Sequence, residues 1–210
     1  NSTVFTIAPA YKKVFGSKSV TVSPLVNYQT LDNDSYQTTV GLNVTGAASV
    51  TKKINIWPHV GGYHQNFYNE DARDAVGISI GNSMSYEFNP KTSWLSSLFY
   101  TYNDADENRY TYNSIFLSNS VTHKISEDLS ATLGYSLQLL YYDDVDPAFG
   151  NSRKDDGHTG YLNFRYALKK FFKTRDPFLS LNLSYNKNNS NHSFQDRDRF
   201  LSVLKLTFSF

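Results

Sequence analysis

The sequence predicts an all-β fold, namely a transmembrane antiparallel up-and-down β-barrel of about 11–12 strands. Three observations predict it. Apolar and polar residues alternate with a period of two along nearly the whole chain. The connections between these segments alternate between short basic ones and longer acidic ones. The chain also ends in a row of alternating apolar residues.

The alternation is clearest between residues 129 and 141. Odd positions there carry Leu, Ala and Tyr, whereas even positions from 130 to 138 carry Ser, Thr, Gly and Gln. Successive side chains of a strand point to opposite faces, so this segment has one apolar and one polar face. We expect eleven such strands, at 3–15, 18–31, 35–49, 53–67, 75–88, 93–103, 108–124, 128–142, 157–170, 177–188 and 198–210.

Two features disturb the pattern. The segment 108–124 alternates least regularly, which favours a β-bulge within it. Pro9, Pro24 and Pro58 lie inside expected strands, although proline has no N–H to donate to a sheet ladder.

The connections fall into two classes that alternate along the chain. The short basic class occurs at 16–18, 52–53, 89–91 and 169–175. The other class is rich in Asp, Glu and Asn and occurs at 32–34, 69–71, 104–107, 143–156 and 186–198. Outer-membrane barrels have short periplasmic turns and longer external loops. The pattern therefore predicts the bacterial outer membrane, with the basic turns inside the periplasm.

A soluble β-sandwich is the main alternative, because its strands also alternate. Sandwich strands average about five or six residues, whereas a membrane-spanning strand needs about 9–11. Most of the expected segments are longer than that. Aromatic residues make up 16% of the chain, as the interfacial girdles of a barrel require. The chain has no cysteine, which excludes disulfides and thiolate metal sites, and no apolar run long enough for a transmembrane helix.

The C-terminal residues form a single apolar row. Its members are Leu204, Leu206, Phe208 and Phe210. The ending resembles the terminal assembly signal of bacterial outer-membrane barrels, which finishes on an aromatic residue. The resemblance implies recognition by the barrel assembly machinery.

The residues 1–210 are expected to form a single barrel domain. Counting strands back from a periplasmic Phe210 places Asn1 outside the cell. Single-chain bacterial barrels generally have even strand numbers. We therefore expect either that the chain is the C-terminal part of a longer one, or that a complementary strand comes from elsewhere.

The last two hairpins carry a family resemblance. The residues concerned are 146–150, Arg153, 155–156, 184–185, 189–191 and 196–199. They resemble the barrels of surface lipoprotein assembly modifier and exopolysaccharide-secretion proteins, in which a helical repeat domain precedes the barrel. The resemblance implies secretion or translocation across the outer membrane, and an upstream periplasmic domain.

The polar face predicts the lining of a lumen. The candidates with the most informative side chains are Glu87, Gln138, Asn163, Arg165 and Lys205. Charges at such positions set ion preference in channels, although they can also pair and plug a narrow interior. The first hypothesis is thus a pore or translocation channel for solute, polysaccharide or protein export. The second is an anchoring barrel with a plugged lumen in an envelope complex, acting through the loops 143–156 and 186–198.

A lipid-modifying enzyme is the third hypothesis, although we predict that the chain is not an enzyme. His192 and Ser193 are the only adjacent His–Ser pair, and they lie in an expected loop. The acidic clusters 104–107 and 143–146 match no complete calcium motif, so no metal or cofactor is expected. The expected contacts are outer-membrane lipid and lipopolysaccharide, and no basic aromatic patch indicates nucleic acid.

Overall fold

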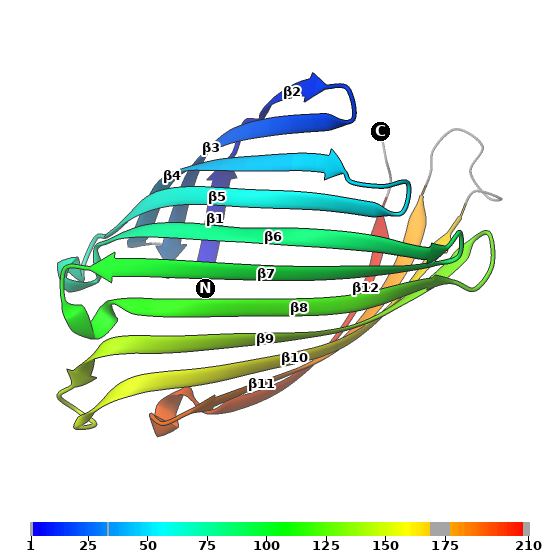
Figure 1. Cartoon of the computed structure of the whole chain (residues 1–210). Helices are drawn as coiled ribbons and strands as arrows, with labels where there is room; N and C mark the ends of the chain where they lie inside the picture. The colour runs from blue at the N-terminus through cyan, green and yellow to red at the C-terminus, as the bar shows by residue number, and fades with distance from the viewer. Residues whose placement is uncertain (1, 33, 169–176, 208–210) are drawn as a thin grey trace.

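The computed structural model describes residues 2–32, 34–168 and 177–207, and its long elements are all β-strands (Figure 1). Within these residues, three short 3₁₀ helices and twelve strands occur, and all twelve strands belong to one sheet. The strands are β1 (Ser2–Ile7), β2 (Tyr11–Phe15), β3 (Lys18–Leu31), β4 (Asp34–Ser49), β5 (Ile54–Phe67), β6 (Ala75–Asn89), β7 (Thr92–Ala105), β8 (Tyr112–Lys124), β9 (Leu129–Asp146), β10 (Asn151–Ala167), β11 (Phe178–Ser190) and β12 (Arg197–Thr207). The helices are η1 (Asp71–Arg73), η2 (Asn108–Tyr110) and η3 (Ser193–Gln195). None of the described helices is long and apolar enough to cross a membrane.

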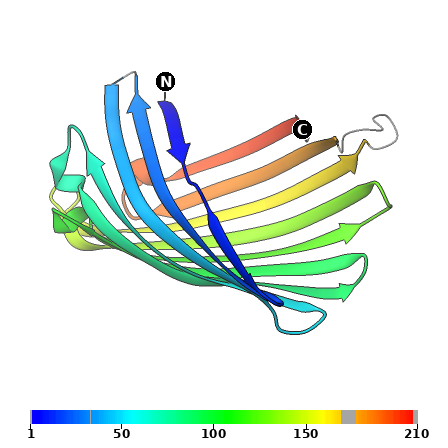
Figure 2. The same ribbon diagram turned by 90° about the horizontal axis from the view of Figure 1, so that it is seen from above.

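The strands follow one another in chain order, and neighbours pair antiparallel. β1 and β2 both pair with β3, so they are two halves of one strand position. Figure 2 shows the sheet curled into a trough with β1 and β12 along its two rims. Among the described residues, the outer edges of these two rims have no strand partner. The expected up-and-down antiparallel architecture is confirmed, with the two rims of the wall unpaired in this stretch of chain.

The prolines lie where the sheet ladder is already interrupted. Pairing of β1 with β3 stops at Ile7 and Val26, and pairing of β2 with β3 starts at Tyr11 and Val22. Pro9 lies in this gap and Pro24 lies opposite it, so neither has to supply an N–H to the other. The ladder between β4 and β5 is likewise interrupted beside Pro58. These positions explain why a long strand tolerates proline.

The register places all polar faces on one side of the sheet. On that side, three glycines each lie directly opposite an aromatic residue of the next strand, in the pairs Gly77–Tyr63, Gly81–Phe99 and Gly134–Tyr161. A Cβ on Gly134 would come within 2.2 Å of the Tyr161 ring, whereas Gly160 on the opposite side has nothing within 4 Å. Side chains converge on the concave face of a curved sheet and diverge on the convex face. The polar face is therefore the concave inner face.

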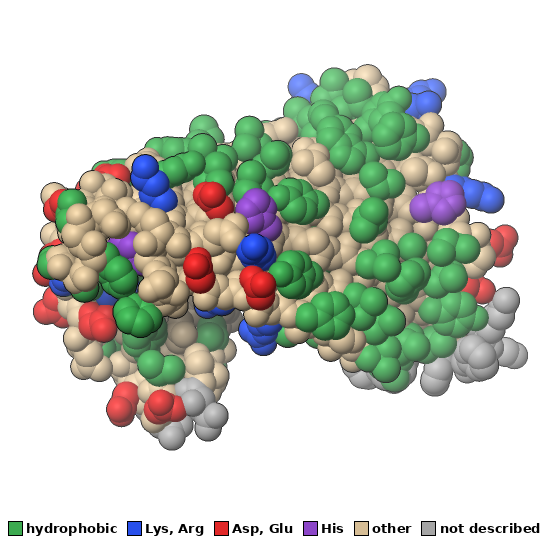
Figure 3. Space-filling model, turned by 90° about the horizontal axis from the view of Figure 1, so that it is seen from below, with side chains coloured by type: hydrophobic (Ala, Val, Ile, Leu, Met, Phe, Trp, Pro, Cys, Tyr) green, Lys and Arg blue, Asp and Glu red, His purple; other side chains and the backbone are tan. Residues whose placement is uncertain are grey.

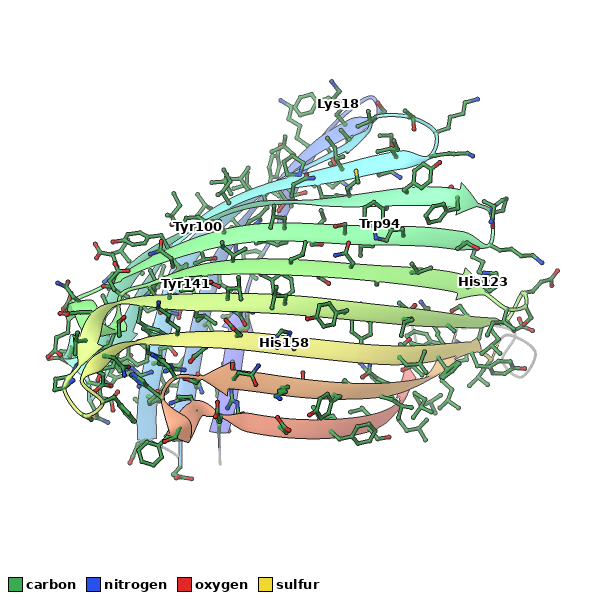
Figure 4. The ribbon with its side chains drawn as sticks, turned by 60° about the horizontal axis from the view of Figure 1, so that its bottom comes forward. Lys18, Trp94, Tyr100, His123, Tyr141 and His158 are labelled. Carbon is green, nitrogen blue, oxygen red and sulfur yellow. The ribbon has the colours of Figure 1, made fainter. Side chains whose placement is uncertain are left out.

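The apolar face is convex and exposed. Ile80 and Leu133 on this face are 60% and 66% exposed, whereas Asn103 on the inner face is 4% exposed. Figure 3 shows hydrophobic side chains gathered towards the turn end of this face and charged side chains concentrated towards the loop end. Trp94 lies nearer the turn end, and Tyr100 and Tyr141 lie nearer the loop end (Figure 4). This is the arrangement of an apolar band between aromatic girdles that suits contact with lipid.

The two ends of the sheet differ as the connections predict. The tight turns at 16–17, 50–53 and 90–91 lie at one end, and η1, η2 and η3 lie at the other (Figure 1). Ser2 pairs with Leu31 at the loop end, so the chain enters the sheet from the side of the loops. The basic connection expected at 169–175 lies outside the described residues.

Three expectations about the loop end were wrong. The loop expected at 143–156 is mostly strand, since β9 continues to Asp146 and β10 begins at Asn151. The loop expected at 186–198 is shorter, since β11 reaches Ser190 and β12 begins at Arg197. The bulge expected in 108–124 is absent from the described pairing of β8, whose register with β7 and β9 is continuous. A strand that rises above the membrane has water on both faces, so it needs no alternation there.

Candidate functional site

The inner wall is built from rows of residues that face one another across the strands. One row crosses seven strands from β6 to β12 in continuous register, and its members are Ser83, Ser97, Ser118, Ser136, Thr159, Asn186 and Arg199. Neighbouring members bond to each other: the Ser83 and Ser97 hydroxyls are 2.8 Å apart, and the Thr159 hydroxyl donates to the Asn186 side chain at 2.7 Å. This hydroxyl row is a hydrophilic surface without large side chains until it reaches Arg199.

The five predicted lumen residues all lie on this inner face. Glu87 and Asn163 share one row, and Arg165 and Lys205 share another with Ser180 between them. Strands in a sheet are about 4.8 Å apart, so Arg165 and Lys205 project about 10 Å from each other. Gln138 lies higher up the wall, towards the loops.

These charges do not neutralise one another within the described residues. The Arg165 guanidinium lies 3.8 Å from the centre of the Phe178 ring, and Glu87 is exposed near the turn end. In the described wall, Glu87 forms no ion pair with Arg165 or Lys205. The structure therefore does not support the hypothesis that these charges pair and plug the interior.

A pocket of about 410 Å³ opens on the inner wall over the β9–β12 part of the hydroxyl row. We call it the inner-wall pocket, and the residues that shape it are Phe116, Gln138, Asn186, Asn188, Arg197 and Arg199. The Gln138 amide donates to the Ser114 hydroxyl at 3.4 Å, and the Asn188 amide donates to the Gln195 carbonyl at 2.8 Å. The neutral side chains are thus held in place by neighbours, while the two guanidinium groups remain exposed.

Arg197 and Arg199 were not predicted as lumen residues: Arg197 fell in the loop expected at 186–198, and Arg199 lay at the start of the strand expected at 198–210. Both belong to β12, and the intervening Asp198 points to the convex face, where the Tyr185 hydroxyl donates to its carboxylate at 3.0 Å. Their odd numbers match that of Lys205, so following the alternation to the start of the expected strand would have found Arg199, and extending that strand by one position would have found Arg197.

The inner face of β10–β12 carries a net positive charge. Its cations are Arg165, Arg197, Arg199 and Lys205, and the one acid among its described strand positions is Asp155. Asp155 is 3% exposed and forms a bidentate ion pair with Arg153, whose guanidinium lies 4.8 Å from the centre of the Tyr142 ring. The four cations therefore face the lumen without a neutralising partner on their own strands.

Arg73 holds η1 against the neighbouring strands at the loop end. The Arg73 guanidinium lies 4.6 Å from the centre of the Phe67 ring and donates to the Tyr36 hydroxyl at 3.0 Å and to the Glu70 carboxylate at 2.6 Å. Burial alone lowers the pKa of Arg73, but the contacts with Glu70 and Tyr36 outweigh it and raise that pKa. Arg73 stays charged and ties η1 to β4 and β5.

The candidate nucleophile pair is not assembled. His192 is 2% exposed, stacks on the Phe149 ring at 4.1 Å, and its Nε2 lies 2.9 Å from the Asn151 side-chain oxygen. The imidazole is therefore engaged with the β9–β10 turn and not with the Ser193 hydroxyl. No group of three His, Asp or Glu side chains in the described chain could hold a metal ion.

Of the predicted assembly signal, Leu204 and Leu206 are described and Phe208 and Phe210 lie outside the described residues. Leu204 and Leu206 are exposed on the convex face of β12, in line with Phe200.

Comparison with known proteins places this wall in context. A family model described as surface lipoprotein assembly modifier matches residues 2–210. No curated protein sequence matches the chain significantly.

The crystal structure of the outer membrane channel DcaP of Acinetobacter baumannii is similar over 96% of this chain with a TM-score of 0.59 and 14% identity. The chain spans 60% of the length of that channel. The KdgM porin is similar over 100% of this chain and 99% of its own, with a TM-score of 0.46 and 12% identity. The fold is that of an outer-membrane β-barrel.

Proposed function

The chain belongs to the surface lipoprotein assembly modifier family, and we propose that it forms most of the wall of an outer-membrane channel for protein export. The observation that carries this proposal is the hydroxyl row, a polar band that crosses the inner face between its aromatic side chains and continues into the inner-wall pocket. An extended polypeptide exposes peptide groups and side chains of every kind. A band of small hydroxyl and amide side chains across the wall offers such a chain hydrogen bonds.

We infer that the wall closes in the membrane. Unpaired backbone groups are costly in lipid, where no water can bond to them. The edges of β1 and β12 that have no strand partner among the described residues therefore need one in the membrane. This fits a wall whose fold resembles a channel of greater length.

The cations of β10–β12 give the channel a preference for anions over cations. Charges that line a narrow passage select the sign of what passes through it. Arg165, Arg197, Arg199 and Lys205 favour anions and acidic segments of a polymer. Because the family is described as a surface lipoprotein assembly modifier, we propose that the exported polymer is a lipoprotein whose polypeptide passes through the lumen.

Conductance of the full-length protein tests this proposal. After insertion into planar bilayers, we expect discrete conductance steps with a preference for chloride over potassium, because the inner wall is polar and cationic. A suitable control is the same protein unfolded by heat before it is added to the bilayer, because the unfolded chain cannot span the membrane and forms no lumen. Verified insertion of folded protein with conductance no higher than the bare bilayer would contradict an open channel.

A further inference from the structure

The convex face holds an apolar groove that the channel function does not use. The groove has a volume of about 600 Å³ and crosses β7 to β12. Its lining side chains are Trp94, Val121, Leu133, Leu162, Leu183 and Phe200, and Gly160 lies between the rings of Tyr135 and Tyr185. This volume is within the range of about 300–1,000 Å³ that ligand sites occupy.

Gly160 creates the deepest part of this groove. It lies directly opposite Tyr135 on β9 and Tyr185 on β11, so a position without a side chain separates two aromatic rings in this row. A Cβ at Gly160 would have no atom within 4 Å. The gap therefore does not result from close packing of the backbone, in contrast to the glycines of the inner face that lie under aromatic rings.

The loop-side border of the groove is polar. The next row towards the loops contains His158 on β10, Lys187 on β11 and Asp198 on β12. His158 Nδ1 lies 2.6 Å from the Tyr135 hydroxyl, and Asp198 accepts from the Tyr185 hydroxyl. Lys187 makes no ion pair with Asp198 in the described structure. The border thus offers one available ammonium group directly above an apolar groove.

Figure 4 shows the direction of this arrangement. Trp94 lies nearer the turn end, and His158 lies in the middle part of β10, on the loop side of Trp94. A molecule in the groove would place its hydrocarbon towards the membrane centre and its polar group beside Lys187, on the side of the external loops. With the loops outside the cell, as the connections predict, this is the orientation of a lipid of the outer leaflet.

We propose that this groove binds an acyl chain of lipid A, the phosphorylated glycolipid anchor of lipopolysaccharide, with a phosphate beside Lys187. The groove faces the lipid and its walls are apolar, which suits a hydrocarbon chain. The cation at its outer border suits an anionic headgroup. The site is separate from the lumen, so it does not depend on conductance.

Retention of lipid A by the purified full-length protein tests the proposal. Diphosphoryl lipid A is added in mixed detergent micelles, and native mass spectrometry measures the fraction of protein that keeps it. Gly160→Leu fills the gap without a backbone clash, and we expect it to lower this fraction at least tenfold. Gly62→Leu is the matched control, because Gly62 is on the same convex face of β5 with only one backbone oxygen, at 3.7 Å, near its Cβ. It should retain lipid A as the unmodified protein does.

A second variant separates the headgroup from the chain. Lys187→Gln should lower retention of diphosphoryl lipid A and leave retention of its dephosphorylated form unchanged. Resistance of the folded band to detergent in unheated gels confirms that each variant is folded. Equal retention by the unmodified protein and Gly160→Leu would overturn the proposal. Conversion of a dimer to a monomer by Gly160→Leu, with no loss of lipid, would also overturn it, since the groove would then be a contact between copies.

Discussion

Leu117→Arg is expected to destabilise the folded protein in a lipid bilayer by up to about 4 kcal/mol, because a cation on the lipid face costs about 2–4 kcal/mol at the bilayer midplane and less towards the interfaces. Leu117 lies in the middle of β8 on the convex face, between Leu98 and Leu137. An arginine there has hydrocarbon around it and apolar neighbours on both adjacent strands. Urea titration of the full-length protein in lipid vesicles, followed by the fluorescence of its tryptophans, measures the loss.

The adjacent residue provides the control. Ser118 lies on the same strand but belongs to the hydroxyl row of the inner face, between Ser97 and Ser136. An arginine at this position reaches the aqueous lumen, so Ser118→Arg should change the free energy of unfolding by less than about 1 kcal/mol. The two substitutions introduce the same side chain one residue apart. Equal destabilisation by both would mean that β8 does not separate lipid from water.

Reversal of two charges in the inner-wall pocket is expected to change the ion preference of the channel. The double variant Arg197→Glu/Arg199→Glu alters the local charge by four units. Two unit charges about 10 Å apart in water interact by roughly 0.4 kcal/mol, so at low salt a passing ion gains or loses more than about 1 kcal/mol. We therefore expect the ratio of chloride to potassium permeability to fall about tenfold. The reversal potential in a salt gradient measures this ratio.

The control for this variant reverses two cations outside the lumen. Lys13 and Lys18 lie on the convex face near the turn end, so Lys13→Glu/Lys18→Glu makes the same change of charge without touching the inner wall. It should leave the permeability ratio nearly unchanged. If both double variants shift the reversal potential equally, the selectivity arises from surface charge and not from the inner-wall pocket.

The alternation of residues predicted most of the wall. The strand expected at 18–31 coincides with β3, and that expected at 75–88 differs from β6 by one residue. These strands cross the apolar band, where one face must be apolar and the other polar. Prediction failed above the band, where the 143–156 segment continues as β9 and β10 with Asp and Asn on both faces. The lipid imposes the pattern, so the pattern ends where the lipid ends.

The candidate site was predicted in part. The alternation within each strand assigned Glu87, Gln138, Asn163, Arg165 and Lys205 to the polar face. The structure places all five on the inner side of the sheet. Alternation within a strand does not show which residues of different strands become neighbours, because that depends on the register between strands. The hydroxyl row, the pocket around Arg197 and Arg199, and the gap at Gly160 between two tyrosines all depend on register.

The identity of the two faces is the central claim, and accessibility to a water-soluble reagent tests it most directly. The chain has no cysteine, so single cysteines can be placed along β9 in a full-length background without other cysteines. The protein in lipid bilayers is then treated with a charged, membrane-impermeant maleimide. We predict labelling at positions 132, 136 and 138, which face the lumen, and none at 133, 137 and 139, which face lipid. Labelling of the second set in place of the first, or of both sets alike, would contradict the account.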